Sequence, residues 1–140
     1  KNDIHGLLYL DLDQFKIVND TCGHSAGDEL LRQVTALLHS KLRTRDTLAR
    51  LGGDEFGIIL EHCPQNEALQ VANTLRELVQ SFRYYWQDKT FTIGVSIGLF
   101  PITHNNEGFA KVLSAADSAC YTAKNEGRNR VHVYQANESE

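Results

Sequence analysis

Acidic residues occur in two short groups of the sequence, and both groups have the types and spacing of a metal site. Asp11 and Asp13 are two residues apart in an apolar stretch, and Asp54 and Glu55 directly follow two glycines. Carboxylates held close together repel one another unless a cation lies between them. Oxygen ligands of this kind suit Mg²⁺ bound together with substrate phosphates. These residues therefore indicate metal-assisted chemistry on a phosphate compound.

Each group has a simpler interpretation when it is taken alone. Asp13 would cap a short helix that follows it, with Asp11 solvated. The second group would be an ordinary Gly-Gly turn with exposed acids. The two groups together favour the metal site. Asp11, Asp54 and Glu55 would be three carboxylates at one point, which is unfavourable without hard cations.

Strand and hairpin patterns place the two groups. Residues 6–13 alternate leucines with other side chains, which is the period of two of a β-strand. Apolar runs at 47–51 and 55–60 flank the glycine turn and predict a β-hairpin. In the sheet we expect, the first strand lies beside this hairpin. The acids of both groups should therefore converge, with no lysine near enough to neutralise them.

The remaining pattern predicts the rest of the fold. After a polar segment at 19–25, we expect helices over 26–42, 68–82 and 109–123, and strands over 91–100 and 131–134, with 84–86 as a partner strand and 101–108 as a loop. The first six elements match the split βαβ order of a ferredoxin-like sheet with helices on one face. We predict an α+β fold with a ferredoxin-like βαββαβ core, an added helix and a C-terminal strand. Residues 1–134 form one domain, followed by a polar tail at 135–140.

Composition excludes several classes of protein. The 140 residues are 41% hydrophobic, which excludes a disordered chain. The net charge of −4 argues against a partner that is a nucleic acid polymer. No apolar run is long enough to span a membrane. Three scattered cysteines, at 22, 63 and 120, favour reduced thiols and a cytoplasmic location.

The residues at 52–56 are Gly-Gly-Asp-Glu-Phe, and with them the chain resembles the GGDEF family of diguanylate cyclase domains. Further segments match the family in the same order: Asp11 to Lys16, Asn19-Asp20, Gly23-His24, Gly27-Asp28, Val95 to Gly98, Ala116-Asp117, Tyr121, Ala123-Lys124 and Gly127 to Asn129. The resemblance extends from Leu8 to Tyr134. It implies the nucleotidyl cyclase, or palm-type, version of the ferredoxin-like fold.

The resemblance implies an activity and its metal ligands. The family condenses two GTP into cyclic di-GMP and two pyrophosphates, with Mg²⁺ or Mn²⁺, in a transient symmetric pair of domains. Two cations are held by residues matching Asp11, the carbonyl of Leu12, Asp54 and Glu55. We assign Asp54 and Glu55 as the catalytic residues. Glycine at positions 52 and 53 lets the backbone approach the nucleotide closely.

The resemblance also implies a substrate site. Asn19 and Asp28 match the guanine readers, and an ionised aspartate suits the two donors on the guanine edge. Lys124 and Arg128 match the basic pair that holds the β- and γ-phosphates. Backbone N–H groups at 14–16 would add phosphate contacts where a short helix begins. This segment contributes Phe15 and Lys16. Each assignment has an alternative without a ligand. An acid such as Asp28 is common in the first turn of a helix, and cations such as Lys124 and Arg128 are common at a helix C-terminus.

A second site is implied by Arg43 and Asp46, which form an R-x-x-D motif five residues before Gly52. The family often carries there an inhibitory site for its product, cyclic di-GMP. The alternative is a solvated helix end. A further arginine of that site aligns with Thr74, so we expect weaker binding or a different arrangement.

The resemblance leaves one rival function open. A GTP-binding module that turns nothing over, and instead controls an attached domain such as a phosphodiesterase, would keep the same residues. The family has a further helical segment before the first strand, and only seven residues precede Leu8 here. We therefore expect the chain to be part of a longer protein with sensor and phosphodiesterase domains attached.

Overall fold

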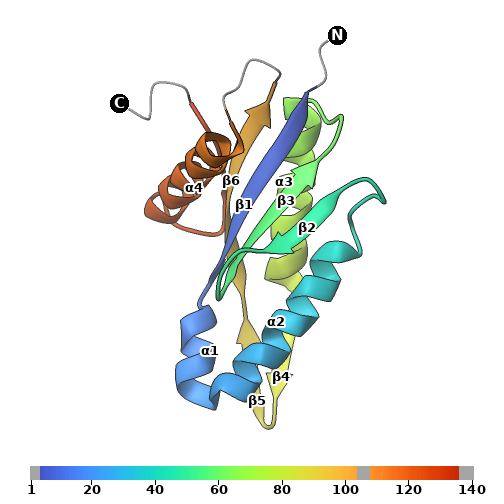
Figure 1. The fold of residues 1–140 in the computed structure, drawn as a ribbon. Coiled ribbons are helices and arrows are strands. Elements are labelled where there is room, and N and C mark those ends of the chain that lie inside the picture. Colours follow the sequence, from blue (N-terminus) through green and yellow to red (C-terminus); the bar gives the residue numbers. More distant parts are fainter. Residues whose placement is uncertain (1–3, 104–107, 136–140) are drawn as a thin grey trace.

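A five-stranded sheet forms the centre of the computed structural model, which describes residues 4–103 and 108–135 (Figure 1). In sheet order the strands are β2 (Thr47–Arg50), β3 (Glu55–Leu60), β1 (His5–Asp13), β6 (Gly94–Ile102) and β7 (Val131–Val133). Neighbours are antiparallel except β6 and β7, which are parallel. The order of the first four strands is that of a ferredoxin-like sheet, which confirms the predicted fold class.

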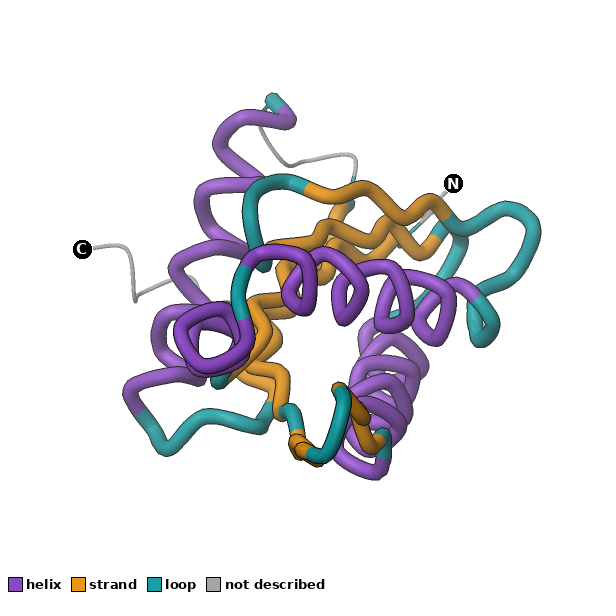
Figure 2. Tube along the Cα trace, turned by 90° about the horizontal axis from the view of Figure 1, so that it is seen from below, coloured by secondary structure: helices purple, strands orange, loops and turns teal. Residues whose placement is uncertain are grey.

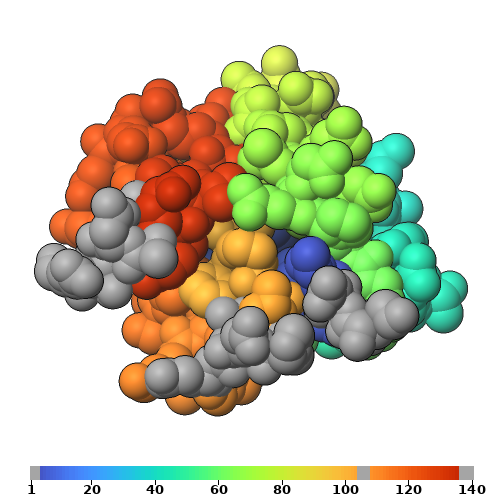
Figure 3. Space-filling view, turned by 90° about the horizontal axis from the view of Figure 1, so that it is seen from above, coloured from blue at the N-terminus to red at the C-terminus, as the bar shows by residue number. Residues whose placement is uncertain are grey.

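Helices cover both faces of this sheet (Figure 2). They are α1 (Phe15–Cys22), α2 (His24–His39), α3 (Gln65–Ser81) and α4 (Phe109–Asn125). The larger core lies between the sheet and the helices α1, α2 and α3, and a smaller one lies under α4. Seen from above, α3 and α4 flank the ends of β1 and β6 (Figure 3). Among the described residues, no helix has the length and apolar character of a membrane span.

The expectation that helices lie on one face only was wrong. In β1 the side chains from Gly6 to Asp13 are all buried, so both faces of this strand are covered. Leu8 and Leu10 belong to the larger core, whereas Leu7 and Tyr9 pack under α4. The period of two was therefore correct. It could not reveal that the second face is also covered, because Tyr9 and the aspartates resemble a solvated face.

The segment after β1 contains more helix than expected. Residues 19–22, predicted as part of a polar segment, lie in α1, whose apolar face buries Phe15 and Val18. Gly23 has φ 94° and separates α1 from α2, a conformation that favours glycine. Helix α2 then ends at His39 rather than at residue 42. The chain between the two helices thus turns at a single residue.

The predicted strand over 91–100 is two strands. β5 (Lys89–Thr92) pairs with β4 (Arg83–Trp86) in a separate two-stranded sheet, and β6 begins at Gly94. Pairing of 84–86 with this region is confirmed. The small sheet is tied to the start of α2, because the hydroxyl of buried Tyr84 donates to the carbonyl of Ala26 over 2.7 Å. The predicted loop at 101–108 begins only after Ile102. Residues 104–107, and 136–140 of the predicted tail, lie outside the described residues.

Helix α4 reaches the sheet through one glycine. A Cβ on Gly98 of β6 would lie 2.2 Å from the carbonyl oxygen of Ala116 and 2.3 Å from the nitrogen of Cys120. The backbones of α4 and β6 are therefore in direct contact, and no larger side chain fits between them. This contact sets the height of α4 above the sheet, and with it the position of every side chain that α4 presents to β1.

We predict that Gly98→Ala lowers the free energy of unfolding by about 2–3 kcal/mol, because the added methyl group must push α4 away from β6. Chemical denaturation measures the change. Gly108→Ala is the control, because a Cβ there meets nothing within 4 Å, and it should cost under about 1 kcal/mol. A folded Gly98→Ala protein with an unchanged denaturation midpoint would contradict this packing.

Candidate active site

Three carboxylates meet at the end of β1. Asp11 on β1 lies opposite Glu55 on β3 in the antiparallel register, and Asp54 directly precedes that strand. One carboxylate oxygen from each residue lies within 4.8 Å of the others. The backbone N–H of Leu12 donates to the carbonyl of Asp54 over 3.0 Å, which fixes the turn against β1. The predicted convergence of the acids is confirmed.

The side chain of Arg50 holds the turn that carries the acids. Its Nε donates to the carbonyl of Gly52 over 2.9 Å, and one terminal nitrogen donates to the carbonyl of Gly53 over 3.0 Å. The N–H of Leu51 donates to the carbonyl of Glu55 over 2.8 Å. A guanidinium can hold two carbonyls at once because its donors form a rigid fork. The sequence analysis missed Arg50, although a cation two residues before a Gly-Gly turn was a visible signal.

A lysine lies against the acids, which corrects the expectation that none would. Nζ of Lys124, from the last turn of α4, donates to Oδ2 of Asp11 over 2.9 Å. This hydrogen bond raises the pKa of Lys124. Burial raises the pKa of Asp54, and repulsion from Asp11 adds to it. Asp117 of α4 had no role in the sequence analysis. Burial raises its pKa, and the negative charges of Glu55 and Asp11 raise it further. One lysine thus leaves the site with an excess of negative charge.

Asp13 connects segments of the site by hydrogen bonds and does not cap a helix. Its Oδ1 accepts from Ser96 Oγ over 2.9 Å, and its Oδ2 accepts from the N–H of Asn129 over 3.0 Å. The residue at the N-terminal cap of α1 is Gln14, so the capping interpretation was wrong. Burial raises the pKa of Asp13. The carboxylate links β1 to the turn after α4, where Arg128 and Asn129 have φ values of 64° and 50°.

A pocket of about 240 Å³ opens beside the acids. It is lined by Asp11, Leu12, Asp13, Gln14, Phe15, Lys16, Asp54, Lys124 and Arg128. The structure therefore brings together the residues predicted for the metal and those predicted for the phosphates. Within this set, Lys16 is largely exposed and pairs with Asp20 at 3.2 Å.

The two predicted guanine readers lie on helices that pack together, Asn19 on α1 and Asp28 on α2. A Cβ on Gly27 would lie 1.8 Å from Oδ1 of Asn19, so this side chain rests on the backbone of α2 beside Asp28. Oδ1 of Asn19 is buried, and it has no hydrogen-bond partner among the described residues. An unpaired buried acceptor is unfavourable unless a ligand or water supplies a donor.

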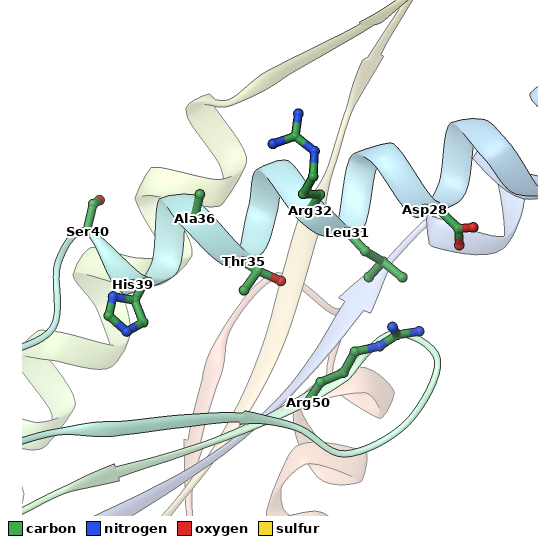
Figure 4. A pocket seen from close by; sticks show the side chains of 8 residues that line it. All are labelled: Asp28, Leu31, Arg32, Thr35, Ala36, His39, Ser40 and Arg50. Carbon is green, nitrogen blue, oxygen red and sulfur yellow. The ribbon is translucent and has the colours of Figure 1, made fainter.

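A wider groove of about 790 Å³ begins at Asp28 and follows α2 (Figure 4). Leu31 and Thr35 point from α2 toward the strand that carries Arg50, and Arg32 points away from it (Figure 4). The groove is lined by one predicted guanine reader, Asp28, and by Arg50, whose side chain holds the turn that carries the acids.

Arg43 and Asp46 form an ion pair in which the arginine is exposed and the carboxylate is covered. Asp46 accepts from the backbone N–H of Arg43 over 2.8 Å and from its guanidinium over 2.7 Å. The Asp46 side chain is 3% exposed and that of Arg43 is 40% exposed. Burial would raise the pKa of Asp46, but the bonds and charge of Arg43 outweigh it and hold that pKa below its ordinary value. The pair lies in the loop after α2, which ends at His39, and Thr74 is an exposed residue of α3.

This pair and the acids lie at opposite ends of β2 (Figure 1). The strand has four residues, so it spans about 13 Å. One nucleotide does not easily touch both places. The two predicted sites are therefore separate features of the surface.

Comparison with known proteins agrees with this geometry. The family described as diguanylate cyclase, GGDEF domain, matches residues 1–130. The chain is 47% identical over 131 residues to the probable diguanylate cyclase DgcE of Escherichia coli, covering 94% of this chain and 12% of that protein. It is 40% identical over 139 residues to the cyclic di-GMP phosphodiesterase PdeB of Shewanella oneidensis, covering 94% and 15%. The chain thus spans a small part of the length of these relatives.

Solved structures give the same result. The GGDEF domain of TpbB (YfiN) from Pseudomonas aeruginosa superposes with a TM-score of 0.91 at 31% identity, covering 98% of this chain and 80% of that one. The GGDEF domain of DgcB from Caulobacter crescentus, in complex with cyclic di-GMP, superposes with a TM-score of 0.87 at 30% identity, covering 94% and 78%. The chain therefore belongs to the GGDEF domain family of diguanylate cyclase domains.

Proposed function

We propose that this domain condenses two GTP into cyclic di-GMP and two pyrophosphates. In each half of the reaction, a 3′-hydroxyl oxygen bonds to the α-phosphorus of the other GTP. The bond from that phosphorus to the pyrophosphate oxygen breaks, and the hydroxyl proton is lost. The observation that carries the proposal is the meeting of Asp11, Asp54 and Glu55 beside a pocket lined by Lys124 and Arg128. Acids and cations at one pocket suit metal-bound phosphates.

The donor set fits a hard divalent cation. Among the described residues, three carboxylates converge and a single lysine contacts them. Burial and Asp11 raise the pKa of Asp54, so further positive charge would be favourable here. Asp11, Asp54, Glu55 and the carbonyl of Leu12 would hold Mg²⁺ or Mn²⁺. When bound, two such ions lower the pKa of the attacking hydroxyl and stabilise the leaving pyrophosphate.

The chain supplies positive charge and backbone donors for the triphosphate. Lys124 of α4 and Arg128 of the turn after it line the pocket, as do Phe15 and Lys16, the first residues of α1. Lys124 is held at Asp11, within reach of both acids and phosphates. It therefore places the β- and γ-phosphates close to the metal ligands.

The end of the site at Asp28 and Asn19 suits guanine. The carboxylate of Asp28 accepts from the N1–H and the amino group of guanine, which adenine does not offer as a pair. The unpaired Oδ1 of Asn19 is a second acceptor beside it. Both acceptors lie where α1 meets α2, and the triphosphate extends from there to the acids.

Two GTP molecules require two domains. Each domain holds one GTP, and a transient symmetric pair presents the two nucleotides to each other. Cyclic di-GMP bound at Arg43 and Asp46 then inhibits at a distance, either by locking the domains in an unproductive arrangement or by straining the hairpin. We place the reaction in the cytoplasm, with sensor and phosphodiesterase domains attached to the same chain.

A second candidate function is a GTP-binding module that regulates an attached domain without turnover. The observation that favours it is the 40% identity to a protein named as a phosphodiesterase. Incubation of concentrated domain with GTP and Mg²⁺, followed by separation of nucleotides, distinguishes the two. Cyclic di-GMP supports the cyclase, and tight GTP binding without product supports the regulatory module.

The metal assignment predicts that Glu55→Gln lowers the turnover about 10²-fold or more without unfolding the domain, because the amide is a poor ligand for a hard cation. Steady-state production of cyclic di-GMP measures the change. Glu77→Gln, on the exposed face of α3, is the matched control and should keep the parent rate. Near-parent turnover by folded Glu55→Gln would reject the assignment.

The guanine assignment predicts that Asp28→Asn weakens GTP binding by about 1–3 kcal/mol, with ATP gaining relative to GTP, because the amide no longer accepts both guanine donors. Calorimetric titration with each nucleotide measures the ratio. Asp88→Asn, in the exposed turn of the β4–β5 hairpin, controls for the loss of one charge. An unchanged ratio of GTP to ATP affinity would exclude Asp28 as a reader.

The product-site assignment predicts that Arg43→Ala relieves inhibition by cyclic di-GMP and leaves the initial rate nearly unchanged. Inhibition of the parent should be non-competitive with GTP, and progress curves at several GTP concentrations measure it. Exposed Arg45→Ala is the control for the lost charge. Because Arg43→Ala removes the cation that pairs with the covered Asp46 carboxylate, Arg43→Ala with Asp46→Asn provides a second variant. Persistent inhibition in both folded variants, or its loss at saturating GTP in the parent, would reject this site.

A further inference from the structure

Tyr9 of β1 makes a hydrogen bond that the proposed reaction has not yet used. Its hydroxyl donates to Oε1 of Glu55 over 2.9 Å. The tyrosine is 8% exposed and Glu55 is partly buried, so the contact is partly shielded from water. The hydroxyl is the donor, because an ionised carboxylate only accepts.

The sheet gives the tyrosine ring one place to lie. Tyr9 is opposite Gly57 on β3 and opposite Gly98 on β6, so it has no side chain beside it on either neighbouring strand. The space over Gly98 is filled by α4, whose residue Cys120 packs in the same cluster as Tyr9. The space over Gly57 is taken by Leu51, whose Cδ1 would lie 3.2 Å from a Cβ there. The ring is confined between α4 and the turn, with its hydroxyl at Glu55.

The contact restricts the orientation of the Glu55 carboxylate. Asp11 is bound by Lys124, and Glu55 receives its hydrogen bond from Tyr9. A carboxylate has about four lone-pair sites, so Oε1 can accept from the hydroxyl while the group keeps acceptor capacity for a cation. A partner of this kind orients a metal ligand, and its loss costs about 10- to 100-fold in metal affinity or activity.

We propose that Tyr9 is a positioning residue that holds the Glu55 carboxylate in the orientation that binds the divalent cation. The inference rests on the proposed function, because it takes Glu55 as a metal ligand. Tyr9 touches neither substrate nor reacting atoms in this account. It acts only through the orientation of Glu55.

The test measures Mn²⁺ binding directly, through the loss of the free Mn²⁺ electron paramagnetic resonance signal, in the presence of a GTP analogue with a non-cleavable α,β-bridge. Tyr9→Phe keeps the ring and removes only the hydroxyl. We expect it to raise the half-saturating Mn²⁺ concentration about 10-fold or more. In steady state the Mg²⁺ requirement should rise similarly, while the KM for GTP at saturating Mg²⁺ stays within about twofold of the parent value.

Two further variants show what the effect depends on. Tyr84→Phe removes another buried hydroxyl hydrogen bond, in the larger core rather than the smaller one that holds Tyr9, and should leave the Mn²⁺ midpoint unchanged. In a Glu55→Gln background, Tyr9→Phe should have little additional effect, because the two residues act as one unit. An unchanged Mn²⁺ midpoint in folded Tyr9→Phe, or a full additional effect in the Glu55→Gln background, would overturn the inference alone. Unchanged Mn²⁺ binding in Glu55→Gln itself would overturn the metal assignment and the inference with it.

Discussion

Repulsion among Asp11, Asp54 and Glu55 is the constraint on which the rest of the structure depends. Their oxygens lie within 4.8 Å of one another at the end of the central strand. Hydrogen bonds hold them there: the β1–β3 ladder aligns Asp11 with Glu55, and the guanidinium of Arg50 donates to the carbonyl of Gly52 in the turn. The fold thus maintains an unfavourable concentration of charge. A divalent cation bound with a triphosphate would offset it.

The position of α4 decides how that charge is balanced. Because Gly98 lets the helix backbone rest on β6, Lys124 at the end of α4 reaches Asp11. Asp13 fixes the turn that follows through the N–H of Asn129, which places Arg128 at the rim of the same pocket. The proposed substrate site and the packing of the sheet are therefore coupled through one helix. A change that moves α4 would disturb the proposed phosphate site without replacing any of its residues.

Local pattern predicted much of this arrangement. The alternation in β1, the Gly-Gly turn and the split βαβ order were enough to bring the acids of two distant segments together. Contacts between segments that no period encodes were missed. The pairing of Lys124 with Asp11 joins residues 113 positions apart, and that of Tyr9 with Glu55 joins residues 46 apart. The helix α4 was predicted, but its position on the second face of the sheet had no local signal. The break between β5 and β6 before Gly94 had none either, because both features depend on what packs against them. The burial of the Asp46 side chain was not predicted, for the same reason.

The most direct test of this account is the location of the cation. Crystals of the domain grown with Mn²⁺ and a non-cleavable GTP analogue can be measured at the manganese absorption edge, where anomalous scattering identifies the metal. The account predicts anomalous peaks in bonding contact with Asp11, Asp54 and Glu55 and with the triphosphate, and Lys124 shared between Asp11 and the phosphates. A bound nucleotide with Mn²⁺ on its phosphates alone, and no peak at the three carboxylates, would contradict it.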